Sequence, residues 1–398
     1  MLKVNKQNYE FGAQPSAIRE LYAYGLKRGE EVGYENIFDF SLGNPNVDLP
    51  DFVMDSLRSH VETPEWVMHC YTENAGYLPV REKIADVLSE SFGQEVSADR
   101  LIVTCGAAAA VSITLSALLS EPTDEVIVLA PYFPEYKVWI EFAGGKCVEV
   151  MTNEDDFSLN VHNIAAAINE NTRGIIVNSP NNPSGAVYSE ESLKELSALL
   201  SAKQKEFGNP IYLIADEPYR ELAYGVDVPH IPTIYRNTIV CYSLSKTFSI
   251  PGERIGFIYV NDKANYAEDL YTAMLGASRA HGYVCAPTTF QRVFLECYGR
   301  PIDIKPYEKN REDIMAVLDR AGFKYVRPQG AFYIMIQAPD GDAEMFKKRA
   351  MKHDILIVPS TSFGINGWCR AGFCVSNDII RRSEQAFKEL AEEYGISS

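Results

Sequence analysis

A lysine and an aspartate, each next to an apolar run, are the residues of this sequence whose types and positions point most directly to chemistry. Lys246 is the single charged residue of the stretch 238–252. A lysine removed from water loses proton affinity and becomes the kind of amine that forms Schiff bases. Asp216 directly follows an apolar run, where an unpaired carboxylate is costly and needs a cationic partner. A protonated pyridine nitrogen would be such a partner, and a purely structural pair with Arg254 is the alternative.

A second group of residues would suit the phosphate and the ring of such a heterocycle. The run 106–110 (Gly-Ala-Ala-Ala-Ala) opens a predicted helix, whose first N–H groups and positive dipole end favour an anion. Arg254 and the Ser243 hydroxyl would complete a phosphate site, because a guanidinium makes charge-assisted bidentate contacts. Phe133 would offer an aromatic face for stacking. Many helices begin with glycine and bind nothing, and an aromatic after a proline is often only core, so the prediction depends on the whole set.

The elements that must position these residues are short β-branched runs alternating with helix-period segments from residue 101 onward. This alternation is typical of a parallel sheet covered by helices. Because open parallel sheets bind ligands beyond the carboxyl ends of their strands, we expect the residues after each run to meet at one edge. The pattern predicts an α/β fold with a seven-stranded, mostly parallel sheet. The predicted strands are 101–105, 126–130, 147–151, 174–178, 211–215, 238–243 and 255–260.

Beyond residue 300 the pattern changes to that of a smaller α+β unit. The first 45 residues hold no complete domain pattern, so we expect them to join the C-terminal part or a partner subunit. The predicted organisation is an N-terminal segment 1–45, a large domain 46–300 and a small domain 301–398. The elements predicted in the small domain are helices at 307–320, 343–352 and 378–394, and strands near 323–327, 331–336, 354–358 and 369–375.

Composition and charge exclude several classes of function. The 398 residues are 46% hydrophobic, which is typical of a globular chain of two or three domains and not of a disordered one. Lys+Arg 37 against Asp+Glu 54 gives a net charge of −17, whose field repels nucleic acid and anionic membranes. The sequence lacks the glycine patterns of nucleotide-binding loops, and its six histidines form no H-x-x-x-H pair. We therefore predict no nucleic-acid partner, no membrane partner and no metal.

The cysteines and the first residues indicate a cytoplasmic protein. The eight cysteines are scattered through apolar stretches without a C-x-x-C pair, which favours reduced core thiols. The first nine residues lack the apolar run of a signal peptide, and no run reaches the length of a membrane span.

Four motifs follow one another along the chain. They are Asn182-Pro183-Ser184-Gly185, Asp216-Glu217-Pro218-Tyr219, Ser243-Leu244-Ser245-Lys246 with Arg254 eight residues later, and Arg370-Ala371-Gly372-Phe373. With these motifs the chain resembles the fold-type I, class I/II pyridoxal-phosphate aminotransferases, which are relatives of aspartate aminotransferase. Further matches lie at 42–45, 71–81 and 362–364, so the similarity extends over almost the whole chain.

The resemblance implies pyridoxal 5'-phosphate as the cofactor and gives each matched residue a role. It implies that Lys246 forms the Schiff base with the cofactor and that Asp216 keeps the ring nitrogen protonated. Tyr219 and Asn182 would hydrogen-bond the ring oxygen, and Phe133 would stack on the ring.

The resemblance also implies which residues bind the phosphate and the substrate. The implied phosphate ligands are the backbone at Gly106, Ala107 and Ala108, the side chains of Ser243 and Arg254, and Tyr71 from the other subunit of a homodimer with shared active sites. Arg370 would clamp the substrate α-carboxylate, with the Gly43 backbone and Asn182 assisting.

Two positions depart from what relatives often have, and a third bears on substrate specificity. Ala107 and Ala108 offer only backbone where relatives often supply a hydroxyl to the phosphate. Some aspartate-specific relatives also place a lysine where this chain has Ala108. Arg279 lies near the stretch where other relatives place an arginine for a side-chain carboxylate, so the choice between dicarboxylate and other substrates stays open.

The expected function is transfer of an amino group between an L-amino acid and a 2-oxo acid by a ping-pong mechanism. A pyridoxal-phosphate β-lyase or a cyclising synthase would use the same cofactor residues and remains an alternative. A more remote alternative reads 243–246 as the S-x-x-K of penicillin-recognising serine enzymes. The companion motifs of those enzymes are missing, because Phe248 stands where their K-T-G motif needs glycine.

Overall fold

The computed structural model describes residues 3–13, 16–62 and 66–396. Its centre is a seven-stranded sheet in the order β2-β8-β7-β6-β5-β3-β4, which confirms the predicted α/β fold. Every neighbouring pair is parallel except the two that β8 makes with β2 and β7. The strands are β2 (Leu101–Thr104), β3 (Glu125–Ala130), β4 (Lys146–Met151), β5 (Thr172–Asn178), β6 (Tyr212–Asp216), β7 (Thr238–Ser243) and β8 (Gly256–Val260).

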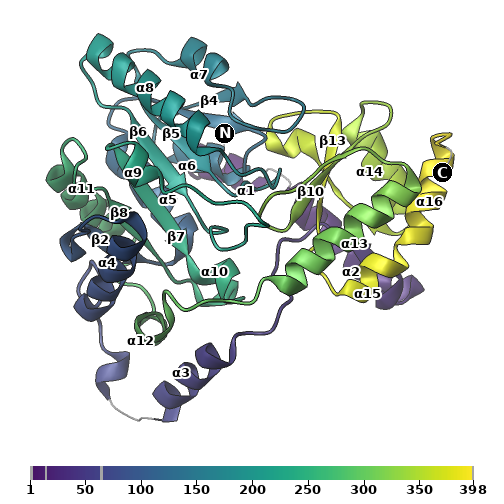
Figure 1. The fold of residues 1–398 in the computed structure, drawn as a ribbon, viewed down its shortest axis with the longest axis horizontal. Helices are drawn as coiled ribbons and strands as arrows, with labels where there is room; N and C mark the ends of the chain where they lie inside the picture. The colour runs from purple at the N-terminus through teal and green to yellow at the C-terminus, as the bar shows by residue number, and fades with distance from the viewer. Residues whose placement is uncertain (1–2, 14–15, 63–65, 397–398) are drawn as a thin grey trace.

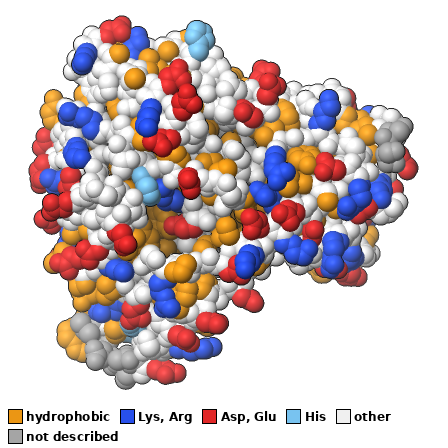
Figure 2. All heavy atoms as spheres, viewed as in Figure 1, with side chains coloured by type: hydrophobic (Ala, Val, Ile, Leu, Met, Phe, Trp, Pro, Cys, Tyr) orange, Lys and Arg blue, Asp and Glu red, His pale blue; other side chains and the backbone are white. Residues whose placement is uncertain are grey.

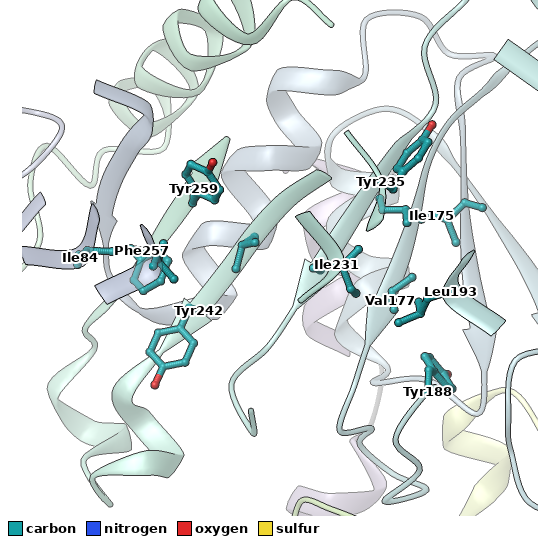
Figure 3. Packing of buried hydrophobic residues seen from close by; sticks show 14 of the residues in the cluster. Ile84, Ile175, Val177, Tyr188, Leu193, Ile231, Tyr235, Tyr242, Phe257 and Tyr259 are labelled. Atoms are coloured by element: carbon teal, nitrogen blue, oxygen red, sulfur yellow. The ribbon is translucent and has the colours of Figure 1, made fainter. Parts of the chain in front are cut away.

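Helices cover both faces of this sheet because its central strands are apolar on both faces. In β6, Leu213 and Ala215 pack in the cluster that includes α8, whereas Ile214 packs in the cluster that includes α5. Figure 3 shows part of the first cluster, where Leu193 of α8 lies against Val177 of β5. The helices of this part of the chain are α3 (Asp51–Glu62), α4 (Leu78–Phe92), α5 (Gly106–Leu118), α6 (Glu135–Phe142), α7 (Val161–Ala167), α8 (Glu190–Phe207), α9 (Ile231–Ile234), α10 (Leu244–Thr247), α11 (Ala267–Ala280) and α12 (Thr288–Cys297).

The C-terminal part forms a smaller α+β unit around a second core, as predicted. Its antiparallel sheet has the order β12-β13-β10-β9. The strands are β9 (Tyr325–Val326), β10 (Tyr333–Gln337), β12 (Val358–Pro359) and β13 (Trp368–Gly372), and the helices are α13 (Lys305–Ala321), α14 (Ala343–Lys352), α15 (Asn377–Arg382) and α16 (Glu384–Glu393).

Two predicted elements of this unit are divided in the structure. The helix predicted over 378–394 is two helices, α15 and α16, separated at Ser383, whose hydroxyl donates to the carbonyl oxygen of Ile380. The strand predicted over 354–358 is also two strands, because β11 (Ile355–Leu356) pairs with the N-terminal segment and β12 pairs with β13.

The N-terminal segment packs on the C-terminal unit. β1 (Phe38–Asp39) pairs in parallel with β11, and α2 (Ala17–Val32) contacts β12. Leu21 and Ile37 share a small core with Phe363. In Figure 1 the purple N-terminal helix α2 lies with the green and yellow C-terminal unit, although the two are at opposite ends of the sequence. Residues 40–43 contact both units, because the Gly372 N–H donates to the Phe40 carbonyl and the Lys246 side chain donates to the Gly43 carbonyl. The short helix α1 (Lys6–Ala13) buries no residue.

The surface carries both signs of charge. On the face in Figure 2, acidic and basic side chains are interspersed over both units. Among the described residues no helix is long and apolar enough to cross a membrane.

Candidate active site

A cavity of about 280 Å³ lies at the carboxyl ends of the central strands and gathers most of the predicted residues. β6 ends at Asp216 and β7 ends at Ser243, so the two strands place both side chains at the cavity. A larger open hollow of about 1130 Å³ lies between β4 and β9 and holds none of the predicted residues. The cavity is lined by Ile18, Gly43, Ala107, Ala108, Phe133, Tyr136, Trp139, Asn178, Asn182, Asp216, Pro218, Tyr219, Ser243, Ser245, Lys246, Pro251, Arg254, Tyr333 and Arg370.

Asp216 is a buried carboxylate with one unused oxygen. Its Oδ2 accepts a hydrogen bond from the Tyr136 hydroxyl, and its Oδ1 has no partner among the described residues. Burial raises its pKa to about 7, partly opposed by the Tyr136 hydrogen bond. The structural pair with Arg254 is not formed, since Arg254 donates to main-chain oxygens of Cys105 and Pro251. A cation at the free oxygen would complete this site.

Lys246 is a buried amine at the start of a very short helix. α10 follows β7 directly, and the Ser243 hydroxyl caps it by accepting from the Ser245 N–H at 3.0 Å. The Lys246 Nζ donates to the carbonyl oxygen of Gly43 at 2.7 Å. Burial, together with the nearby charges of Arg254 and Arg370, lowers the pKa of Lys246 to about 8, partly opposed by Cys374. The amine is therefore partly neutral, and nucleophilic, near neutral pH.

The first turn of α5 and Arg254 form a second polar side of the cavity. Gly106 opens the helix with φ +83°, and a Cβ there would lie 2.8 Å from the Arg254 guanidinium. Glycine is thus needed at 106 for Arg254 to approach the helix start. Ala107, Ala108 and Arg254 all line the cavity. N–H groups at a helix start beside a guanidinium suit a phosphate.

Arg370 is a buried guanidinium without a buried counterion. It lies on β13 with 1% of its surface exposed, and no carboxylate of the described residues pairs with it. It donates to the Asn182 Oδ1 at 3.2 Å and to the Ser41 carbonyl at 2.5 Å, while its Nε has no partner. Because a buried unpaired charge is costly, this position favours an anionic ligand such as a carboxylate.

The remaining cavity residues offer a hydroxyl, an amide and an aromatic face. The Tyr219 hydroxyl lies 3.2 Å from the Tyr333 hydroxyl, and burial holds its pKa well above the usual value, so it is protonated. Asn182 turns its Oδ1 to Arg370, which can only donate, and this leaves its Nδ2 as a donor. Phe133 lines the cavity beside Tyr136, with ring centroids 5.7 Å apart.

Two of the residues considered at the sequence level lie away from this cavity. Tyr71 is 87% exposed and borders a separate shallow hollow with Tyr77 and Arg292. Arg279 is exposed on the last turn of α11. Neither residue reaches the cavity within one chain.

The cavity also contains residues that the sequence motifs did not single out. Asn178 ends β5, so its strand-end position was a usable signal, and its Nδ2 donates to the Asp216 carbonyl at 2.8 Å. Tyr136 and Tyr333 carry no such signal, because tyrosine is common in this chain and their partners are distant in sequence. Among the described residues no group of three or more His, Cys, Asp or Glu is arranged to hold a metal.

Comparison with known proteins gives one consistent family. Residues 35–386 match the family model of class I and II aminotransferases. An amino transferase from Eubacterium rectale superposes with a TM-score of 0.97 at 45% identity and covers 99% of this chain and 100% of its own. The aspartate aminotransferase of Thermus thermophilus with maleate superposes with a TM-score of 0.87 at 28% identity, covering 98% of this chain and 100% of its own. The aspartate/prephenate aminotransferase of Thermus thermophilus is 30% identical over 392 residues, which is 95% of this chain and 96% of that protein.

Proposed function

Because this chain belongs to the class I and II aminotransferase family, we propose that the cavity at the strand ends is its active site. Lys246, Asp216 and Arg370 have different roles in that site. The chain is a pyridoxal-phosphate-dependent aminotransferase that acts on an amino acid and a 2-oxo acid. One observation carries the assignment of the cavity. A desolvated amine, a buried carboxylate with an unused oxygen and a buried guanidinium without a counterion all line it.

The residues of the cavity fit the cofactor. The unused Oδ1 of Asp216 requires a cation, and a protonated ring nitrogen is one. The N–H groups of α5 with Ser243 and Arg254 suit the phosphate, and Phe133 offers a face for the ring. Lys246 would hold the cofactor through its amine. When bound, the cofactor supplies an aldehyde that condenses with amines and a ring that accepts electrons from the substrate carbon.

Lys246 is the group that moves the proton. In its neutral form the Nζ accepts the proton from the substrate Cα, and it can return that proton to a neighbouring carbon. A pKa of about 8 matches this task near neutral pH, because both protonation states are well populated. The hydrogen bond to Gly43 keeps the amine in the cavity.

Asp216 and Arg370 provide the two charged contacts of the site, one for the cofactor ring and one for the substrate carboxylate. The Asp216 carboxylate would keep the ring nitrogen of the bound cofactor protonated, and the Tyr136 hydroxyl orients that carboxylate. Arg370 would bind the substrate α-carboxylate, while the Nδ2 of Asn182 and the Tyr219 hydroxyl would be the donors for the ring oxygen. Burial of all five side chains excludes water and strengthens each of these contacts.

We also propose the assembly and the domain boundaries that the sequence predicts. A homodimer in which Tyr71 reaches the partner's phosphate is supported by the exposure of the large apolar side chains of Val61, Trp66 and Tyr71. Domain boundaries near 45 and 300 are supported by two cores, one built mainly from residues 53–298 and the other mainly from residues 307–391. A cytoplasmic location is supported by eight free cysteines.

Amino transfer is tested against acceptor-free chemistry in one assay. Purified protein loaded with pyridoxal phosphate is given amino acids with and without a 2-oxo acid. Aspartate and prephenate, named for the relatives, head the panel of donors and acceptors. We expect repeated turnover only with both substrates, and no more than one equivalent of 2-oxo acid per active site from the amino acid alone. Release of pyruvate and ammonia without an acceptor would favour the β-lyase alternative, which the relatives' names do not favour.

A further inference from the structure

Tyr333 contacts three residues of the proposed site, although no sequence motif singled it out. It lies on β10 with its side chain buried, and its hydroxyl is 3.2 Å from the Tyr219 hydroxyl. The guanidinium of Arg370 lies over its ring, 4.5 Å from the centroid. A Cβ at Gly43 would overlap its hydroxyl, so glycine is needed there for the tyrosine to reach this position.

The Tyr219 and Tyr333 hydroxyls have one proton each to donate. A phenol has one donor and can accept at its oxygen. Burial raises the pKa of both tyrosines above the usual value, to about 12 for Tyr333, so both keep their protons at neutral pH. In the pair, one hydroxyl donates to the other. The Tyr333 hydroxyl has no other hydrogen-bond partner among the described residues.

The direction of that hydrogen bond decides what Tyr219 offers to the cavity. If Tyr219 donates to Tyr333, its proton is consumed and the cavity meets a lone pair. If Tyr333 donates, the Tyr219 proton is free to point into the cavity, and its O–H bond is further polarised by accepting. An electron-rich oxygen in the cavity selects the second arrangement.

We infer that Tyr333 is a positioning residue, whose hydroxyl donates to Tyr219 and thereby directs the Tyr219 proton to the ring oxygen of the cofactor. This inference rests on the proposed function of the cavity. Tyr333 acts through Tyr219, since its hydroxyl pairs with that residue whereas the amine of Lys246 donates to the Gly43 carbonyl. Its ring separately supports Arg370, and a phenylalanine keeps that contact.

The test is Tyr333→Phe in the cofactor-loaded enzyme, followed by the pH dependence of its visible absorption band. If Tyr219 donates more weakly, the ring oxygen of the cofactor keeps more negative charge. That charge makes the proton on the nearby Lys246 nitrogen harder to remove. We expect the pH midpoint of the band to rise by about 0.3 to 1 unit. The kcat should fall by about threefold to tenfold, while the KM for the amino acid stays within about twofold because the ring still supports Arg370.

Two further variants separate positioning from packing. Tyr235→Phe is the matched control, because Tyr235 is also buried and its hydroxyl donates outside the cavity, to the Ile211 carbonyl at 2.7 Å. It should leave the band midpoint and the kcat unchanged. Adding Tyr333→Phe to Tyr219→Phe should shift the midpoint no further than Tyr219→Phe alone, since Tyr333 acts through Tyr219.

The outcomes distinguish this inference from the function on which it rests. A wild-type midpoint and kcat in Tyr333→Phe would overturn the inference, and so would shifts that add in the double variant. A wild-type protein that shows no visible band with pyridoxal phosphate would overturn the proposed site itself.

Discussion

The side-chain nitrogen of Lys246 donates to the main-chain oxygen of Gly43 at 2.7 Å, across 203 positions of sequence. The two preceding carbonyls of the same segment accept from the small unit, because Arg370 donates to Ser41 and the Cys374 thiol donates to Leu42. Three successive carbonyls thus receive donors from both units of the chain. Residues 41–43 connect the Lys246 amine and the Arg370 guanidinium through one short segment.

Replacing the amine should stop turnover without unfolding the protein. In Lys246→Ala we expect kcat to fall by at least about a thousandfold, because the group that moves the proton is gone. The midpoint of thermal unfolding of the cofactor-free protein should not fall, since a buried amine is removed. Lys194→Ala, on the exposed side of α8, is the matched control and should retain wild-type kcat. Substantial amino transfer by Lys246→Ala would contradict the assignment.

Asp216 should make the stability of the cofactor-free protein depend on pH. Its pKa is raised from 3.8 to about 7, so the folded state binds more protons than the unfolded state between these values. Its favourable contribution is complete below about pH 4 and is lost as pH rises through 7. Asp216→Asn should therefore be more stable than wild type at pH 8, by up to a few kcal/mol, and this difference should shrink toward pH 5.

The measurement is denaturant unfolding of both cofactor-free proteins at pH 5 and pH 8. Bound cofactor should remove the disadvantage of wild type, because the ring nitrogen supplies the missing cation. A difference between the two proteins that does not vary with pH would contradict this account of Asp216.

Arg370 should determine the affinity for the substrate carboxylate. Arg370→Lys keeps the charge but loses the planar pair of donors that binds a carboxylate at two points. We expect kcat/KM to fall by about tenfold to a hundredfold, mainly through KM. Amines that lack the α-carboxylate should lose little by comparison. Equal losses for both kinds of substrate would show that Arg370 acts only on the fold.

Tyr71 provides a test of the shared active site. Tyr71→Ala should weaken pyridoxal-phosphate binding by about tenfold, because a hydroxyl contact to the phosphate is lost. In a mixed dimer of Tyr71→Ala and Lys246→Ala chains, one site would combine a native Lys246 with a native Tyr71 from the partner. We expect activity at limiting cofactor to be restored by mixing. If Tyr71 served its own chain, every mixed site would keep one defect and mixing would restore nothing.

The sequence predicted the strand positions well because buried parallel strands are apolar on both faces. The ends of β6 and β7 followed directly, and with them the places of Asp216 and Ser243. The direction of β8 could not be predicted, because an apolar run has the same pattern in either direction. β8 lies antiparallel between β2 and β7, which are far apart in sequence.

The parts of the site that escaped prediction depend on contacts between distant side chains. Tyr136 and Asp216 are 80 positions apart, and Tyr219 and Tyr333 are 114 apart. Nothing local distinguishes these tyrosines from the others of the chain, of which there are 23 in all. A sequence motif can indicate a residue at the end of a strand. It cannot indicate Tyr136 or Tyr333, because their contacts form only when the sheet and the small unit fold.

The central claim is that Lys246 and Asp216 hold a cofactor that passes an amino group between two substrates. It is tested most directly by the near-ultraviolet and visible spectrum of the purified protein with pyridoxal phosphate, before and after amino acids are added without an oxo acid. We predict a visible band that a suitable amino acid bleaches and that a 2-oxo acid then restores. A protein that stays colourless after incubation with pyridoxal phosphate, or whose band no amino acid changes, would contradict the account.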